Sequence, residues 1–479
     1  MIIIIMTTRG INSIELGTLS GTAQKSAVVS PVDGSSASSS LDRRETSFGG
    51  APRDASKLPE RHATWQRVSF LLIADIVGVG ILELGYRIHE LGWILGIFFL
   101  TAFFVVNMYT ALLMSRLRDA FPLSVTYGDL AGYVMDSPKW AMLVWGAVYT
   151  NLSMSLASYL LVIAKTLEGI FYGSSGSWCD PFVSLVAALL LIPLNQIRSM
   201  HGMSYLAIVS FITIALSVAL ILGKVGTLDR TDVVTTAGTS PGLDFWGFFG
   251  AMSGFIFAYA GQSIYMEFMA EMVTPTKFPK SLSVGAPSIY LLYLISSTIQ
   301  YSFTGQNTVS YMPDALPNDA IKVIANVSLL IHMLISYNIT NQVLTRAIHV
   351  KLFPRTANAS TCTARLHWFF ISLGFLFLSW IVSNAVPFFD NLTGIIGALL
   401  LSPISLMFPC FFYLQADRKG TLVTASGDKR TLSATEKTAQ VAIIAFGAFV
   451  WIVGTIANIR DASNKSNNDA TPFSCNVLK

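Results

Sequence analysis

Long apolar runs recur along most of this chain and constrain its fold more than any other feature. Runs of about 20 apolar residues can cross a bilayer as helices, and here they are continuous rather than alternating, which excludes a transmembrane strand barrel. We therefore predict an all-α integral membrane protein with about eleven transmembrane helices, the fourth of them short. The expected spans are 66–88, 93–115, 140–164, 181–196, 203–223, 246–270, 283–303, 321–344, 366–386, 391–415 and 439–458.

The composition agrees with lipid as the solvent. Charged residues make up 12% of the chain and apolar residues 53%, whereas soluble domains carry about 25% charged residues. The net charge of +4 is too small for a protein that binds nucleic acid by neutralising phosphates. The 4 cysteines include no CxxC pair, so we expect no metal site and no cofactor.

The ends of the chain differ from its apolar middle. Residues 1–64 are rich in serine and lack periodicity, which predicts a disordered cytoplasmic tail that is either passive or regulatory. The apolar start is too short for a signal peptide. Residues 65–458 form the expected transmembrane domain, and 459–479 a short non-cytoplasmic tail.

The loops carry an unequal share of positive charge. Lysine and arginine concentrate in the N-terminal tail and in the loops after even-numbered spans, which places the N-terminus in the cytoplasm and the C-terminus outside. Cys179 and Cys475 then share the oxidising side, where they either form a disulfide or stay as free thiols. Asn464-Lys465-Ser466 is a glycosylation sequon on that side, a weak motif because short sequons are common.

Two of the expected spans contain small residues where a helix is easily interrupted. Span 1 carries Gly78, Gly80 and Gly85, and span 6 carries the run 258–263 (Ala-Tyr-Ala-Gly-Gln-Ser). Such glycines either serve close helix packing or open the helix. Paired breaks in corresponding spans favour a transporter site, in which freed amides bind a carboxylate and freed carbonyls an ammonium or a coupling cation.

The residues around these breaks resemble the amino acid/auxin permease family. The resemblance covers roughly residues 65–458, and its four motifs occur in the family's order. They are Gly78-Val79-Gly80-Ile81-Leu82 through Leu91-Gly92-Trp93; Phe257–Gln262 through Glu267, Pro275 and Phe278-Pro279-Lys280; His332 with Ser336-Tyr337 and Gln342; and Val386-Pro387-Phe388-Phe389 through Gly394, Gly397-Ala398 and Pro409-Cys410.

The resemblance implies a fold, a function and a site. The fold is the LeuT type, two inverted five-helix repeats plus one helix, and members carry amino acids or related carboxylates with protons or, in some branches, sodium. Tyr259 would be a gate over the substrate. By position, the substrate carboxylate would lie at Gly78, Val79, Gly80 and Ile81, and its other end at Ala258, Tyr259, Ala260, Gly261 and Gln262.

Glu83 and Arg87 depart from the family pattern. They lie four residues apart in the order that favours a helical ion pair, which is one interpretation. The other is that Glu83 is a titratable coupling group or selects a cationic substrate. In the first turn after the break, we expect its carboxylate to compete with substrate for the freed amides.

Asp75, Glu267 and His332 complete the set of proton-coupling candidates with Glu83. Ionisable groups inside spans are costly and are functional candidates by default, and histidine titrates near neutral pH. Asp75 and His332 are alternatively a polar pore residue and a packing residue. Sodium coupling, the less favoured alternative, would use span 1 carbonyls with Ser336 or Thr340.

Other functional classes fit less well. The sequence has no HEXXH, GxSxG or P-loop motif, which argues against a membrane enzyme, and no repeated filter for a channel. We expect a monomeric, proton-coupled amino acid transporter of the plasma membrane, with a vacuolar or lysosomal membrane as the alternative location. An organic-acid permease and a nutrient receptor on a permease scaffold remain open.

Overall fold

The computed structural model describes residues 61–171, 179–198, 203–228, 232–356, 359, 361–386, 388–422, 429–468, 472, 473 and 475. Most of the expected N-terminal tail lies outside these residues. The described chain is almost entirely helical, and Ala63 and Met272 form an isolated β-bridge. The all-helical class is confirmed.

The helices follow one another with short connections. In chain order they are α2 (Trp65–Ile76), η2 (Val79–Leu82), α3 (Leu84–Ala120), α4 (Tyr127–Met135), α5 (Pro138–Phe171), α6 (Asp180–Leu194), α7 (Met203–Val225), α8 (Phe245–Tyr259), α9 (Gln262–Glu271), η3 (Pro275–Lys277), α10 (Phe278–Thr304), η4 (Gly305–Asn307), η5 (Met312–Ala315), α11 (Ala320–Leu352), α12 (Cys362–Ala385), α13 (Phe389–Ile395), the π-helical η6 (Ile396–Met407), α14 (Phe408–Arg418) and α15 (Ala434–Asn468).

Within the described residues, 8 helical runs are long and apolar enough to cross a membrane. They are α3, α5, α7, α10, α11, α12, the continuous run α13–η6–α14, and α15. The other three expected spans are the short α6 and two that are divided between helices, 66–88 and 246–270. The chain is an integral membrane protein with many spans, while the count of eleven stays a prediction.

The outward faces of these helices are apolar. Phe98, Leu143, Leu189 and Phe370 are each more than half exposed on α3, α5, α6 and α12. In water such surface would be unfavourable and a site for association. Against acyl chains it is the favourable surface of a membrane helix, which explains why the apolar residues point outward as well as inward.

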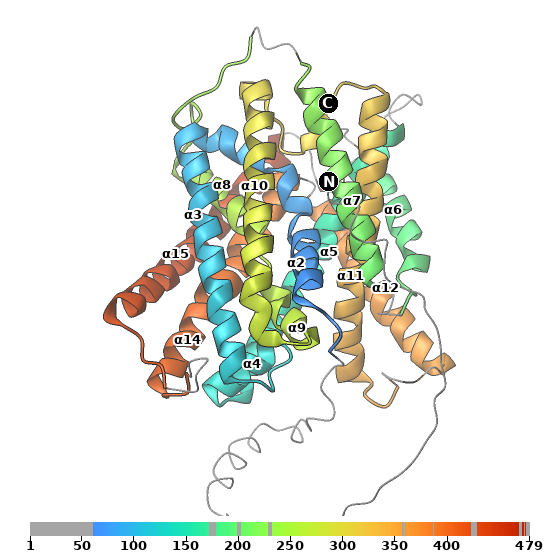
Figure 1. Cartoon of the computed structure of the whole chain (residues 1–479). Coiled ribbons are helices and arrows are strands. Elements are labelled where there is room, and N and C mark those ends of the chain that lie inside the picture. Colours follow the sequence, from blue (N-terminus) through green and yellow to red (C-terminus); the bar gives the residue numbers. More distant parts are fainter. Residues whose placement is uncertain are drawn as a thin grey trace, which may run out of the picture. The chain divides into compact units, whose positions relative to one another are not determined.

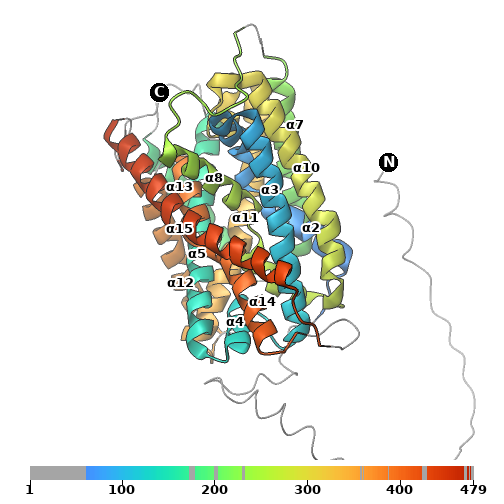
Figure 2. The same ribbon diagram turned by 90° about the vertical axis from the view of Figure 1, so that its left-hand side faces the viewer.

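The two divided spans lie in the interior of the helix bundle. α3 and α10 run side by side in both views (Figure 1, Figure 2), and α2 packs against α7 and α10. α8 packs against α3, η6 and α15, and α15 crosses beside α14 in Figure 2. Each divided span therefore has helical neighbours on several sides.

Gly92 marks the end of the first span and the start of the second. Its φ is +74° inside α3, a left-handed conformation that glycine adopts without steric cost. A Cβ there would also collide with the carbonyl of Gly238. The segment containing Gly238 caps this corner, since Trp93 N–H donates to Thr236 O and Ile94 N–H to Ala237 O, both at 3.1 Å.

Two helical features were not expected from the sequence. The short helix α4 begins at a capping box, in which Thr126 and Asp129 each bond to the other's backbone N–H. α15 continues to Asn468, ten residues past the expected end of the last span, and its final turns carry charged side chains that contact the rest of the bundle.

Candidate functional site

The predicted interruptions of spans 1 and 6 are both present. α2 ends at Ile76 and helical structure resumes at Val79 in η2, which leads into α3. α8 ends at Tyr259 and α9 begins at Gln262. The first N–H groups of a helix and the last carbonyls of the preceding one lack helical partners, so each break exposes both kinds of backbone group.

The two breaks touch one another at Gly80 and Ala258. A Cβ added to Gly80 would lie 2.7 Å from the Cα of Ala258, closer than real side chains approach. The packing explanation for Gly80 therefore holds, and it holds together with the broken helix. Gly78 is different, because its added Cβ would meet its nearest atoms only at 3.8 Å.

Tyr293 of α10 joins the broken ends of both spans. Its hydroxyl lies 2.8 Å from the carbonyl oxygen of Ile76 and 2.8 Å from that of Ala258. A phenol has a single hydrogen, so it cannot give both carbonyls a full hydrogen bond at once. One carbonyl at the breaks thus keeps acceptor capacity for another donor. Tyr293 was not predicted from the sequence, in which its only signal is a tyrosine within span 7.

Asn107 of α3 holds the next carbonyl of span 6. Its side-chain nitrogen donates to Tyr259 O at 2.6 Å and lies 3.4 Å from the Gln262 oxygen. Gln262 in turn donates to the Thr110 hydroxyl at 3.0 Å. The predicted site residue Gln262 is therefore fully buried within a hydrogen-bonded group of side chains from α3, and Asn107 is a second residue that sequence reasoning missed.

His332 of α11 faces the break in span 1. Its Nδ1 lies 2.9 Å from the carbonyl oxygen of Ser210 and 2.8 Å from the Ser210 hydroxyl. A carbonyl only accepts, so this contact favours a proton on Nδ1 and a lone pair on Nε2. Nε2 is buried without a hydrogen-bond partner in the described chain, and the space above Gly78 opens toward it at 3.8 Å.

Asp75 and Glu267 occupy different surroundings. Asp75 is the penultimate residue of α2, directly before the break, and its electrostatic neighbours include the hydroxyls of Tyr159 and Tyr265. Glu267, on α9, has Asp129 and Glu271 as electrostatic neighbours. The structure therefore brings Asp75 and His332 to the span 1 break and places Glu267 among other carboxylates toward α4.

Tyr259 is almost fully buried beside the breaks. Its ring lies 5.3 Å from that of Tyr293, and its hydroxyl has no partner within the described residues. A small cavity borders the ring. Its lining is mostly apolar and comes from Leu72, Ile76, Phe104, Asn107, Tyr259, Tyr265, Leu282, Ala286 and Ile289.

Glu83 and Arg87 form a buried ionic contact with the start of α13. Arg87 pairs with Glu83 at 3.0 Å and with Glu90 at 3.1 Å, and it donates to the carbonyl oxygen of Asp390 at 2.6 Å. The hydroxyl of Thr393 donates to Glu83 at 2.7 Å. We call Glu83, Arg87, Asp390 and Thr393 the latch, because they join the second half of span 1 to α13.

The ion-pair interpretation of Glu83 is confirmed, and one expectation about it is wrong. Glu83 is the N-cap residue of α3, yet its side chain makes no capping hydrogen bond to the backbone. Thr393 and Arg87 both donate to its Oε2 instead, so this oxygen does not compete for the amides after the break, and Oε1 has no hydrogen-bond partner among the described residues. Those amides stay free of this competitor.

The Cys179–Cys475 disulfide is present, which decides between the two alternatives that the sequence left open. The bond joins the N-cap residue of α6 to the segment after α15. Cys362 and Cys410 are free.

Comparison with known proteins identifies the family. A family model described as "Transmembrane amino acid transporter protein" matches residues 61–460. The chain belongs to this family. It is 23% identical over 448 residues to the "N amino acid transport system protein" of Neurospora crassa, covering 90% of this chain and 93% of that one. It is 25% identical over 399 residues to "Amino acid transporter AVT1B" of Arabidopsis thaliana, covering 82% and 70%.

A solved structure agrees in fold with this member of the transporter family. "Crystal structure of MhsT in complex with L-phenylalanine" aligns with a TM-score of 0.57 at 13% identity, covering 84% of this chain and all of that one. At this identity the likeness shows the fold alone. The LeuT-type fold is confirmed by it, and the broken spans are where that fold was expected to have them.

Proposed function

We propose that this protein is a secondary active transporter of amino acids that works by proton-coupled symport. The observation that carries the proposal is the contact between the two helix breaks at Gly80 and Ala258, in a chain of the amino acid transporter family. Paired breaks supply unpaired donors and acceptors at one point near the middle of the bilayer, which suits a zwitterion.

The substrate carboxylate binds at the amides of Val79, Gly80 and Ile81. Those groups begin the second half of span 1, where the helix dipole favours negative charge. The ammonium binds near Ile76 and Ala258. The Ile76 carbonyl also accepts the Gly78 N–H at 2.9 Å, so the Ala258 carbonyl, which shares the single hydrogen of Tyr293, has acceptor capacity left for the ammonium. Tyr259 covers the site, and a small cavity borders its ring.

Protons couple through the groups at the span 1 break. The lone pair of His332 Nε2 faces Gly78, and Asp75 lies in the last turn of α2, directly before the break. A proton on either group changes the charge next to the bound substrate, so substrate and proton affect each other's affinity. Glu83 is held by Arg87 and Thr393 and acts in closing the site rather than in carrying the proton.

The end of the bundle that carries the disulfide faces outward. Disulfides persist in oxidising compartments, and the same orientation follows from the distribution of lysine and arginine. The latch then closes the site from the outside, and alternating access requires that it open and close once per cycle. The membrane is the plasma membrane or, alternatively, that of the vacuole or lysosome.

Uptake of a labelled amino acid mixture tests the proposal. The protein is expressed in transport-deficient cells and assayed at acidic and neutral outside pH, with and without a protonophore. We expect uptake that rises at acidic pH and collapses with the protonophore. Sodium-dependent uptake without a proton effect would overturn the coupling, and no uptake by protein at the cell surface would overturn plasma-membrane amino acid transport.

A further inference from the structure

The last turns of α15 contact the latch at Asp390, in the first turn of α13. Lys465 Nζ pairs with Asp390 at 2.5 Å and bonds Asn391 at 3.0 Å. Asp461 pairs with Lys465 at 2.9 Å and accepts from Asn391 at 2.8 Å. These contacts span about 75 residues of sequence, and they fix the first turn of α13 to the C-terminal segment.

That same turn of α13 is the part which faces span 1. The carbonyl of Asp390 accepts from Arg87, and the hydroxyl of Thr393 donates to Glu83. Asp390 therefore uses its backbone on one side and its carboxylate on the other. Any shift of this turn changes both latch contacts, because the Asp390 carbonyl and the Thr393 hydroxyl lie within one helical turn.

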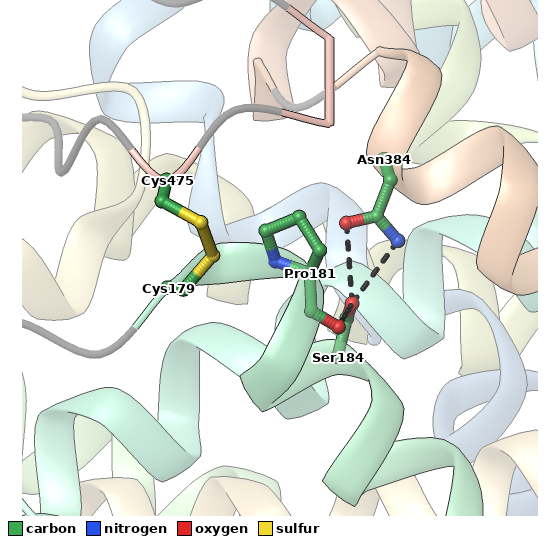
Figure 3. The surroundings of a disulfide bond; sticks show 5 residues. All are labelled: Cys179, Pro181, Ser184, Asn384 and Cys475. Carbon is green, nitrogen blue, oxygen red and sulfur yellow. Dashed lines mark hydrogen bonds between the residues drawn. A yellow bond between two sulfur atoms is a disulfide. The ribbon is translucent and has the colours of Figure 1, made fainter.

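The chain beyond α15 is attached to two other helices. Cys475 is bonded to Cys179 at the start of α6, and Phe473 N–H donates to the carbonyl of Asn384 at 3.3 Å near the end of α12. Figure 3 shows the disulfide beside Ser184 and Asn384, whose side chains hydrogen-bond at 3.0 and 3.2 Å and join α6 to α12. The ring of Phe473 adds a contact with Trp380.

We propose that Lys465 is a positioning residue for the latch, and that Lys465, Phe473 and Cys475 together form a strap that holds α13 to the ends of α6 and α12. The strap itself is inferred from these contacts, and only its consequence for a transport cycle rests on the proposed function. With α13 held, the second half of span 1 closes against a fixed partner. Without the strap, α13 moves together with the second half of span 1. The closed arrangement at the disulfide end of the bundle then loses stability.

The proposal predicts a paired change in transport kinetics. A less stable closed state leaves more of the protein open at the disulfide end, which removes part of the conformational cost of binding from that side. Loss of Lys465 should therefore lower KM several-fold while it lowers the maximal rate, because closure must occur in every cycle. A variant that is merely unstable would lose active protein at an unchanged KM.

Hydrogen exchange tests the strap without relying on transport. We would compare the full-length protein with Lys465→Met and Lys465→Arg in nanodiscs and follow the amides of 79–91 and 389–395. Both variants retain the glycosylation sequon at Asn464, since only its middle residue changes. We expect several-fold faster exchange in Lys465→Met. In Lys465→Arg we expect near wild-type exchange, because arginine keeps a positive charge beside Asp390.

The disulfide provides a second, independent arm. Reduction of the wild type and the variant Cys475→Ser should both speed exchange in the same two segments by a smaller factor, and the variant should no longer respond to reductant. Unchanged exchange in folded Lys465→Met would overturn the proposal. Faster exchange in a protein that moves no amino acid would support the strap and contradict the transport function, so the two failures are distinguishable.

Discussion

The helix breaks and the latch both involve the second half of span 1, but they are held together by different chemistry. At the breaks, neutral groups satisfy the backbone, with Tyr293 and Asn107 donating to carbonyls. At the latch, Arg87 is buried among carboxylates at 3.0 and 3.1 Å, and Lys465 supplies a second cation to Asp390.

This difference in chemistry indicates that the breaks respond to a ligand, whereas the latch responds to a change of conformation. A neutral hydrogen bond contributes about 1 kcal/mol net, so a substrate group can replace one at small cost. A buried ion pair contributes little to stability when intact but costs about 3–5 kcal/mol when one partner is removed. We therefore expect the breaks to tolerate exchange of partners and the latch to act as an all-or-none contact.

Arg87→Met should produce the largest effect. It leaves Glu83 and Glu90 without their buried cation, and we expect a loss of about 3–5 kcal/mol of stability with loss of uptake. Thermal unfolding in detergent and surface expression measure the first, and labelled uptake the second. The matched control is Arg418→Met at the exposed end of α14, which should leave both unchanged.

A second substitution sharpens the assignment to Glu83. In Glu83→Gln with Arg87→Met the buried carboxylate is gone as well, so much of the lost stability should return. If the double variant is as unstable as Arg87→Met alone, then Arg87 acts through packing or through Asp390 and not through its pair with Glu83.

Gly80→Ala should rank second and act at the breaks. The new methyl has to displace the Ala258 backbone, which is 2.7 Å away, and overpacking of this kind costs about 1–3 kcal/mol. We expect uptake to be lost while the protein still folds. Gly223→Ala in α7 is the control, because an added Cβ there meets nothing within 4 Å and uptake should stay normal.

The pair Gly80 and Gly78 separates packing from binding. Gly78 has room for a methyl group, so Gly78→Ala should keep wild-type thermal stability. That methyl fills the space between the break and His332, and we expect a raised KM for the substrate. Equal loss of stability in both variants would mean that the two glycines serve packing alone.

Sequence reasoning reached the breaks because their cause is local. Glycine at 78, 80 and 261 weakens a helix wherever it stands, and the family motifs added the pairing of the two breaks. Their hydrogen-bond partners could not be predicted in the same way. Tyr293 and Asn107 come from other helices, and a single tyrosine or asparagine in an apolar span gives no register from which its target is known.

At the latch, too, the contact within one helix could be predicted from the sequence and the contacts between distant segments could not. The spacing of Glu83 and Arg87 predicted their ion pair, because both lie on one helix. The donor from Thr393 is 310 residues away in sequence, and without it the carboxylate was expected to turn to the nearby amides. The topology placed Cys179 and Cys475 on one side, but only the packing of the chain after α15 against α12 brings the two sulfurs together.

Tyr293→Phe should have a smaller effect than either glycine or arginine change. It removes the one hydroxyl shared by Ile76 O and Ala258 O and keeps the ring, so we expect about 1–2 kcal/mol of lost stability. Because the substrate ammonium is proposed to take one of these carbonyls, substrate should restore more stability to this variant than to wild type. Thermal unfolding with and without substrate measures the difference, and an equal gain in both proteins would contradict the proposed ammonium position.

The ion pair between Lys224 and Asp319 should give the smallest effect and completes the comparison with the latch. It joins α7 to the start of α11 at 2.7 Å, but both side chains are a quarter to a third exposed. The hydrogen bond from Lys224 holds the pKa of Asp319 below its usual range. A carboxyl with a lowered folded-state pKa stabilises the protein above its ordinary pKa of about 4 and loses that contribution as the pH falls through the lowered value.

Lys224→Gln should therefore lower the melting temperature slightly at neutral pH and low salt, and the difference from wild type should shrink in high salt and at acidic pH. A drop as large as that of Arg87→Met would show that burial is not what separates the latch from an ordinary surface ion pair.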